Sequence, residues 1–250
     1  MSQKTILITG ASSGIGAALA RAHAAAGVTL LLWGRDQARL DDAAAQCRAL
    51  GAQCVVDIVD VRDIAAMTAR LISRDGEMPI DLAIFNAGLG GTAPDTAAAE
   101  DPQSVRAMAE VNFVAPLVGA NVMADAMARR GGGQIVLVGS ISESFPLPMA
   151  PTYVATKAGL AMFAEALSIR MRKRRVVVTL VSPGFIDTPM SRQVTEPKPF
   201  LMQADHASRI IARGIARGDR RIVVPWQFAV IRGFARLLPR ALLRLILSNA

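Results

Sequence analysis

The amino-acid sequence predicts a single α/β domain built on a doubly wound, parallel sheet. A chain of 250 residues has a suitable length for one such domain. Short apolar runs alternate along it with longer, Ala-rich segments of helical period, a pattern typical of strands that are buried on both faces and covered by helices. A glycine-rich turn joins the first of these runs to the first helical segment, and sheets of this class bind ligands at such a connection.

Strands and helices alternate along most of the chain. We expect strands at residues 4–9, 28–33, 54–58, 80–85, 134–140, 175–181 and 221–225. We expect helices over residues 14–26, 37–50, 62–75, 103–130, 152–173 and 205–217. Because the crossovers of such a sheet are right-handed, its ligands bind beyond the carboxyl ends of the strands. The functional residues should therefore follow strand ends.

Composition narrows the class of protein. The N-terminus passes from four mostly polar residues straight into an apolar strand and lacks the pattern of a secretory signal, so we expect a cytoplasmic protein. Cys47 and Cys54 are too few for a disulfide framework and lack metal-type spacing, which predicts reduced cysteines and no metal site. The net charge of +8 is accompanied by neither interleaved aromatic residues nor a recognition motif, so we expect no nucleic-acid partner.

The glycine-rich turn has the composition of a phosphate cradle. It lies between the first strand and an amphipathic helix and reads Thr9-Gly10-Ala11-Ser12-Ser13-Gly14-Ile15-Gly16. Glycines let bare backbone approach a pyrophosphate, and the helix N-terminus offers free N–H groups and the positive end of its dipole. The turn therefore predicts a dinucleotide cofactor, with an ordinary tight turn as the alternative interpretation.

Further short motifs follow this turn in a fixed order. They are Asp60-Val61, Asn86-Ala87-Gly88, Asn112, Ser140, Tyr153 with Lys157, Pro183-Gly184 and Thr188. Together with the spacing Thr-Gly-x-x-x-Gly-x-Gly in the turn, they resemble the short-chain dehydrogenase/reductase family from residue 4 to about residue 190. The resemblance implies a Rossmann-type cofactor-binding and catalytic domain over residues 1–225. A basic, apolar helical extension over residues 226–250 would pack on this domain or on a partner.

The resemblance also assigns residues to the cofactor. Asp60 should contact the adenine, Asn86 should hold the adenosine side of the pocket, and Thr188 should meet the nicotinamide end. Capping of the next helix by Asp60 and a simple turn at Asn86 are the alternatives. The full expected set is Gly10, Ser12, Ser13, Gly14, Ile15, Gly16, Arg35, Asp60, Val61, Asn86, Ala87, Gly88, Tyr153, Lys157, Pro183, Gly184, Ile186 and Thr188.

The end of the second strand distinguishes between the two nicotinamide cofactors. An NAD enzyme usually has an acid there, which would repel a 2′-phosphate. This chain has Gly34 in that place, followed by Arg35, whose guanidinium can hold a phosphate through two hydrogen bonds. Many similar NADP-type proteins carry a second basic residue where this chain has Ser13. We expect NADP(H) as the cofactor. Asp36 is expected to be the N-cap of the next helix, with a contact to the ribose as the alternative.

Tyr153 and Lys157 are predicted to act together. They lie four residues apart on a predicted helix and therefore share one face. A free phenol has a pKa of about 10, too high for efficient proton transfer at neutral pH, and a neighbouring ammonium group favours the phenolate. Tyr153 is also the only tyrosine of the chain.

Two further residues complete the predicted catalytic set. Ser140 lies at the end of a predicted strand, where its hydroxyl can bind a substrate oxygen, and the resemblance implies that Asn112 holds a water beside the lysine. The set predicts an NADPH-dependent oxidoreductase that transfers a hydride between the nicotinamide and a hydrophobic ketone, aldehyde or secondary alcohol, with Tyr153 as general acid or base. An NADPH-binding sensor or interaction protein on the same fold is the alternative.

Two segments concern substrates and partners. The Pro-interrupted stretch between residues 188 and 205 is expected to cover an apolar substrate or to be a plain surface connection. In the tail, arginines recur every fourth residue among apolar ones, at positions 232, 236, 240 and 244, which excludes a membrane-spanning helix there. This stripe predicts a subunit interface, a cover over the substrate pocket, or a helix on an anionic membrane. We expect a homodimer or homotetramer.

Overall fold

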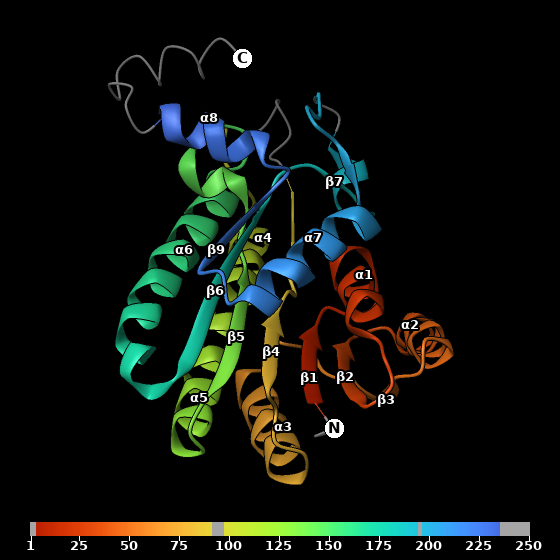
Figure 1. Cartoon of the computed structure of the whole chain (residues 1–250). Coiled ribbons are helices and arrows are strands. Elements are labelled where there is room, and N and C mark those ends of the chain that lie inside the picture. Colours follow the sequence, from red (N-terminus) through yellow and green to blue (C-terminus); the bar gives the residue numbers. More distant parts are fainter. Residues whose placement is uncertain (1–3, 92–97, 195–196, 236–250) are drawn as a thin grey trace.

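Seven parallel strands form the centre of the molecule (Figure 1). The computed structural model describes residues 4–91, 98–194 and 197–235, and its strands follow the order β3-β2-β1-β4-β5-β6-β9. They are β1 (Lys4–Thr9), β2 (Val28–Gly34), β3 (Gln53–Ile58), β4 (Leu82–Phe85), β5 (Gly133–Val138), β6 (Val176–Pro183) and β9 (Arg221–Val224). The order reverses between β1 and β4, which confirms the predicted doubly wound sheet. In such sheets, ligands bind beyond the carboxyl ends of the strands at this point.

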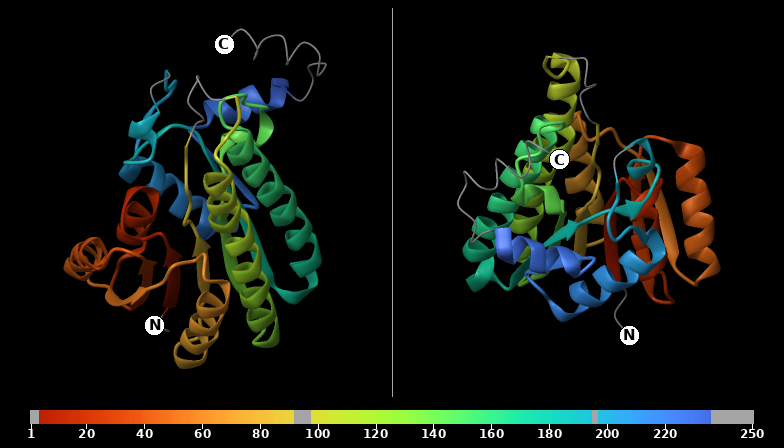
Figure 2. Two further views of the ribbon diagram at one scale, coloured as in Figure 1. Left: turned by 180° about the vertical axis from the view of Figure 1, so that it is seen from behind. Right: turned by 90° about the horizontal axis from the view of Figure 1, so that it is seen from above.

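Helices cover both faces of the sheet (Figure 2). On one face, α1 (Gly14–His23) packs against both α2 (Gln37–Ala49) and α7 (Ala204–Arg217). On the other face lie α3 (Ile64–Glu77), α4 (Pro102–Ala109), α5 (Ala115–Arg129) and α6 (Pro151–Met171). The last described helix is α8 (Gln227–Ala235), which follows β9. Three short 3₁₀ turns are η2 (Ile141–Ser144), η3 (Arg172–Arg174) and η4 (Ser191–Gln193).

The helix predicted over residues 103–130 contains a π-helical segment. This segment, η1 (Glu110–Val114), joins α4 to α5 without a break in the rod. By length and composition, residues 102–129 form the one described helix that is apolar enough to cross a membrane, and α5 packs against α3 and β5. Single π turns inside α-helices occur frequently at functional sites. This one contains Asn112.

The central strands are mostly apolar because both of their faces are buried. Leu7 and Leu31 belong to the apolar cluster on the side of α3 and α5, whereas Ile6, Ile8 and Leu30 belong to the cluster on the side of α1 and α2. Side chains alternate between the two faces of a strand, so a strand that is covered on both sides has few polar positions. This explains why the central strands are continuous apolar runs in the sequence.

A buried carboxylate fixes α3 to the first strands. Asp57 on β3 accepts hydrogen bonds from the Trp33 indole Nε1 (3.0 Å) and from Arg74 Nε (2.8 Å) and Nη2 (2.7 Å). Burial alone would raise the pKa of Asp57, but the hydrogen bonds and charge of Arg74 outweigh it and hold that pKa below its usual value. Asp57 therefore remains ionised in the core and ties three elements together.

Several element boundaries differ from the sequence prediction by one to three residues, among them the end of α1 at His23, where residue 26 was predicted. Strand β4 begins at Leu82 rather than at residue 80, because the Ile80 N–H donates to Asp75 Oδ1 (2.9 Å) and is drawn out of the ladder. Strand β5 ends at Val138, and Ser140 begins the η2 turn instead of ending the strand. Strand β6 continues to Pro183 because its last residues pair with β9.

The stretch predicted as a lid or plain connection contains a second, small sheet. Strands β7 (Ile186–Asp187) and β8 (Met202–Gln203) pair in parallel, one at the start and one at the end of this stretch. Strands of two residues are too short to produce a periodic pattern, so they could not be predicted from the sequence. Of the basic extension predicted over residues 226–250, α8 is described, and Arg236, Arg240 and Arg244 lie outside the described residues.

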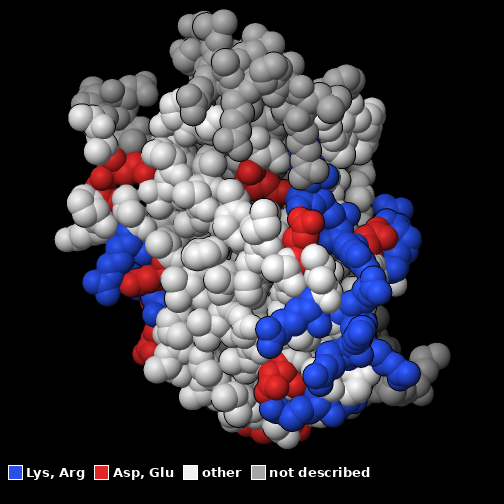
Figure 3. All heavy atoms as spheres, turned by 90° about the vertical axis from the view of Figure 1, so that its left-hand side faces the viewer, with Lys and Arg blue, Asp and Glu red and all other residues white. Residues whose placement is uncertain are grey.

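Basic charge is not confined to the C-terminal extension. A band of Lys and Arg side chains crosses the side of the molecule on which α6 lies (Figure 3). The end of α6 and the η3 turn supply exposed basic residues, namely Arg170, Arg172, Lys173, Arg174 and Arg175. The folded domain itself therefore presents a positive surface.

Asp57→Asn should lower the free energy of unfolding at neutral pH by about 2 to 4 kcal/mol, because it removes a buried charge that Arg74 requires. A carboxylate with a lowered pKa stabilises the fold only while it is ionised, so the difference from the unmodified protein should shrink as the pH falls through that lowered pKa. Urea unfolding at several pH values would measure it. Asp42→Asn, at an exposed site on α2, is the control. A difference that does not change with pH would contradict the role of the charge.

Candidate active site

The glycine turn is fixed to the neighbouring strand end by hydrogen bonds. The Thr9 hydroxyl accepts from the backbone N–H groups of Asn86 (3.0 Å) and Ala87 (3.1 Å). In return, Asn86 Nδ2 donates to the carbonyls of Thr9 (3.1 Å) and Gly10 (3.2 Å). The predicted Asn86-Ala87-Gly88 motif thus holds the ends of β1 and β4 together, and the Asn86 side chain is occupied by the turn itself.

Gly10 and Gly16 have no room for a side chain. Gly10 has a φ of +66°, and a Cβ there would lie 2.9 Å from Ala87 Cα. At Gly16, a Cβ would lie 2.1 Å from the Gly10 carbonyl oxygen. Ser13, the N-cap of α1, makes no side-chain capping bond, so its hydroxyl does not occupy the N–H groups of the first turn. Bare backbone beside a helix N-terminus fits the pyrophosphate of a dinucleotide.

The remaining residues of the cradle surround this backbone. Ser12 is partly exposed, and Ile15 packs against the core on the side of α1. Gly14 has a φ of +55°, and a Cβ there would lie 3.2 Å from Thr188 Cγ2. Val61 is buried beside the carboxyl end of the sheet. The turn, predicted to hold the pyrophosphate, and Thr188, predicted to meet the nicotinamide end, therefore lie side by side.

Arg35, Asp36 and Asp60 lie around the end of β2. Arg35 is exposed, and Asp36 caps α2 by accepting from the Arg39 N–H (3.1 Å), as predicted. The α3 cap is Asp63 rather than Asp60, so the alternative of a capping Asp60 is wrong. Asp60 instead receives the Arg62 guanidinium, with Nε at 3.0 Å and Nη2 at 2.5 Å from Oδ2. These hydrogen bonds lower the pKa of Asp60.

Ser140, Tyr153 and Lys157 come together where β5 ends. Tyr153 and Lys157 lie on the first turns of α6, and the Tyr153 hydroxyl is hydrogen-bonded to Ser140. The Lys157 Nζ lies 5.8 Å from the centre of the Tyr153 ring and donates to the Val138 carbonyl (2.9 Å). Only 5% of Lys157 is exposed. The three side chains predicted to act together therefore share one enclosed site.

Burial shifts the pKa values of both ionisable groups. It lowers the pKa of Lys157 to about 8 and raises the pKa of Tyr153. The hydrogen bond from Ser140 acts in the opposite direction on Tyr153. Lys157 thus retains most of its charge at neutral pH, next to a phenol that needs positive charge to ionise.

Asn112 braces the loop that follows β4. Its Oδ1 accepts from the Leu89 N–H (2.7 Å), and its Nδ2 donates to the Leu89 carbonyl (2.8 Å). A Cβ at Gly88 would lie 3.4 Å from Asn112 Oδ1 and 3.8 Å from Lys157 Nζ. Asn112 therefore reaches the surroundings of Lys157 through Gly88 and Leu89.

Residues after β6 pack against α8. A Cβ at Gly184 would lie 2.3 Å from the Phe228 ring, so this glycine makes room for a side chain of α8. Phe228 also contacts the rings of Phe200 (5.7 Å between centroids) and Phe185 (6.3 Å). Pro183 ends β6, and Ile186 is buried on β7. The sequence prediction missed Phe228 because it stands in the tail, outside the family pattern.

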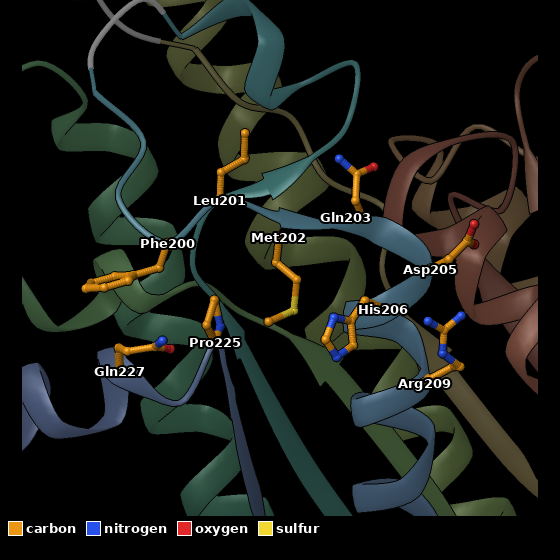
Figure 4. A pocket seen from close by; sticks show the side chains of 9 residues that line it. All are labelled: Phe200, Leu201, Met202, Gln203, Asp205, His206, Arg209, Pro225 and Gln227. Atoms are coloured by element: carbon orange, nitrogen blue, oxygen red, sulfur yellow. The ribbon is translucent and has the colours of Figure 1, made fainter.

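A surface hollow of about 560 Å³ lies between β8, α7 and the end of β9 (Figure 4). It is lined by Phe200, Leu201, Met202, Gln203, Asp205, His206, Arg209, Pro225 and Gln227. Met202 and His206 extend into it from β8 and α7. Ser140, Tyr153 and Lys157 do not line it, so the hollow is separate from the predicted catalytic set.

Comparison with known proteins agrees with this geometry. The short chain dehydrogenase family matches residues 4–199. The chain belongs to the short-chain dehydrogenase family. An uncharacterized oxidoreductase of Myxococcus xanthus is 34% identical to this short-chain dehydrogenase over 244 residues, which cover 97% of this chain and 95% of the relative.

Solved structures of the same family superpose on this short-chain dehydrogenase. A short-chain dehydrogenase from Sphingobium yanoikuyae in complex with NADPH has a TM-score of 0.83 at 26% identity, covering 93% of this chain and 94% of that one. The bulky-bulky ketone specific alcohol dehydrogenase from Comamonas testosteroni has a TM-score of 0.79 at 26% identity, covering 96% and 97%. The chain is thus an oxidoreductase of this family.

Lys157→Ala should reduce turnover by about a hundredfold or more and move the pH dependence of catalysis upward. Without the ammonium, the Tyr153 phenolate forms only at higher pH. Lys157→Met tests the charge with less loss of packing. The pH profile of kcat/KM would measure the shift, and a profile unchanged in both variants would show that Lys157 does not tune Tyr153.

Proposed function

We propose that this short-chain dehydrogenase is an NADPH-dependent oxidoreductase that transfers a hydride between the nicotinamide and a hydrophobic ketone or aldehyde, or the corresponding alcohol. The observation that carries the proposal is the enclosed trio at the end of β5, in which Tyr153 is hydrogen-bonded to Ser140 and lies beside Lys157. A cofactor cradle at the end of the adjacent β1–β4 pair supplies the second half of such a site.

Each residue of the trio has a distinct task in this proposal. The bound nicotinamide supplies or accepts the hydride. Tyr153 gives a proton to the carbonyl oxygen in reduction and takes it from the alcohol in oxidation. Ser140 donates a hydrogen bond to the same oxygen, and the charge of Lys157 favours the phenolate that Tyr153 becomes. Asn112 keeps the Leu89 backbone in place beside them.

The choice of NADPH rests on the end of β2. Gly34 stands where an acid would repel a 2′-phosphate, and exposed Arg35 follows it. Arg39, of which 65% of the side chain is exposed, lies one helical turn further on. The nearby carboxylate of Asp60 is paired with Arg62, which reduces its repulsion of a phosphate. The similar dehydrogenase from Sphingobium yanoikuyae was solved with NADPH.

The choice of an apolar substrate rests on the segment after β7. A Cβ at Gly90 would lie 2.8 Å from Met190, so this segment meets the loop after β4. Met190, Phe200 and Leu201 are apolar and exposed. The similar enzyme from Comamonas testosteroni is named for bulky-bulky ketones. A small apolar carbonyl compound or alcohol fits this lining better than a charged one.

Partners and location extend the proposal. We expect a cytoplasmic homodimer or homotetramer, without nucleic acid. The contact between Phe228 and Gly184 favours a tail that covers the site, while the basic band on the side of α6 favours contact with an anionic membrane surface. Oligomer mass and sedimentation with anionic vesicles at low and high salt would distinguish these roles.

Tyr153→Phe should abolish turnover on a panel of carbonyl compounds and alcohols while NADPH binding is retained, because the variant lacks only the hydroxyl. Cofactor absorbance would follow turnover, and fluorescence titration would follow binding. If the unmodified protein turns over no compound of a broad panel, the sensor or interaction role on the same fold becomes the better explanation.

Arg35→Ala should remove most of the preference for NADPH over NADH. A charged, hydrogen-bonded contact contributes about 1.5 to 3 kcal/mol, which is about tenfold to over a hundredfold in Kd. Calorimetric titration of the unmodified protein and of Arg35→Ala with NADPH and with NADH would measure this preference. Equal Kd values for NADPH and NADH in the unmodified protein would refute the assignment.

A further inference from the structure

Glu143 is a buried carboxylate directly behind the catalytic trio. It lies three residues after Ser140 on the η2 turn, and only 3% of its side chain is exposed. A carboxylate at such a depth is unfavourable unless other groups compensate its charge. Neither the family motifs nor the proposed proton transfer uses it, so its partners should explain its presence.

Two elements hold one oxygen of this carboxylate. Glu143 Oε1 accepts from the Ser182 hydroxyl on β6 (3.0 Å) and from the Arg221 guanidinium on β9. Arg232 on α8 also acts on it electrostatically. Burial raises the pKa of Glu143, and the charge of Arg221 with the hydrogen bonds from Ser182 and Arg221 opposes that rise. The carboxylate is therefore held in one place by groups that favour its ionised form.

The other oxygen faces the backbone of the active site. Within the described residues, Glu143 Oε2 has no hydrogen-bond partner, and a Cβ at Gly139 would lie 3.0 Å from it. Gly139 links Val138, whose carbonyl accepts from Lys157, to Ser140, which bonds Tyr153. The free oxygen thus lies against the peptide that connects the two halves of the trio.

The charge of Glu143 reaches both ionisable residues of the site. It raises the pKa of Lys157 against the effect of burial, and it also raises the pKa of Tyr153. Arg221 from β9 and Arg232 from α8 are the charged groups that face Glu143 from the other elements packed there. Without this carboxylate, burial would leave Lys157 less charged at neutral pH.

We propose that Glu143 is a positioning residue: its carboxylate, held by Ser182 and Arg221, supports the Val138–Ser140 backbone and places a negative charge behind Tyr153 and Lys157. The proposal rests on the proposed roles of Tyr153 and Lys157. Arg221 and Ser182 contribute to the same role, because they hold the Glu143 carboxylate in place.

The composition of the chain allows a test without any substrate. Tyr153 is the single tyrosine, so ultraviolet difference absorbance reports its ionisation alone. The chain has four lysines, and the nuclear magnetic resonance signal of Lys157 in isotope-labelled protein can be assigned with Lys157→Met. Both titrations use the unmodified full-length protein as reference, and thermal unfolding shows whether each variant is folded.

Glu143→Gln keeps the size of the side chain and removes its charge. The titration midpoints of Tyr153 and Lys157 should therefore both move down by about one pH unit. Arg221→Gln leaves the carboxylate less compensated, so both midpoints should move up. Glu165→Gln, at an exposed position on α6, should move neither. Midpoints that stay in place in folded Glu143→Gln or Arg221→Gln would overturn the proposal. If Glu143→Gln does not fold, the Arg221→Gln midpoints decide.

Turnover measurements separate this inference from the proposed function. If the unmodified protein turns over carbonyl compounds but the midpoints do not move in the variants, the role of Glu143 fails and the function stands. If the midpoints move as expected but no compound is turned over, the role of Glu143 stands and the function fails.

Discussion

The close approach of the ends of β1 and β4 is the constraint on which the rest of the site depends. Thr9, Gly10, Asn86 and Ala87 form a closed set of hydrogen bonds there, and Gly16 lies so close to the Gly10 carbonyl that no side chain fits. This contact sets the start of α1 and the path of the loop after β4. Because that loop passes Asn112 and Lys157 at Gly88, the cofactor cradle and the catalytic residues are positioned by one local arrangement.

Charge inside the domain follows one rule at two places. Asp57 and Glu143 are both buried carboxylates, and in each case an arginine from another element compensates the charge. At Asp57 the pair joins strands and a helix, and the hydrogen bonds and charge of Arg74 outweigh burial, so the pKa of Asp57 is lowered. At Glu143 burial dominates, and the unsatisfied oxygen lies beside the trio. Similar groups thus have different consequences, because their compensation differs.

Much of the fold was predictable because periodicity reports burial. The central strands are apolar on both faces and were located to within about two residues. The errors arose where single hydrogen bonds end an element, as Asp75 does before β4, or where an element is too short for any period, as β7 and β8 are. For the candidate site, family order located Ser140, Tyr153 and Lys157, whereas Phe228 and Glu143 lay outside the family pattern.

The sequence by itself determined the sheet, the glycine cradle, the spacing of Tyr153 and Lys157, and the absence of an acid at the end of β2, because each of these is encoded within a few neighbouring residues. Only the tertiary structure decided that the Asn86 amide group donates to the carbonyl of Thr9 and that Phe228 of α8 packs onto Gly184. It also decided that Arg221 binds Glu143, which lies 78 positions away in the chain. Such contacts join residues that are far apart in the chain, and the sequence around each residue does not predict its partner.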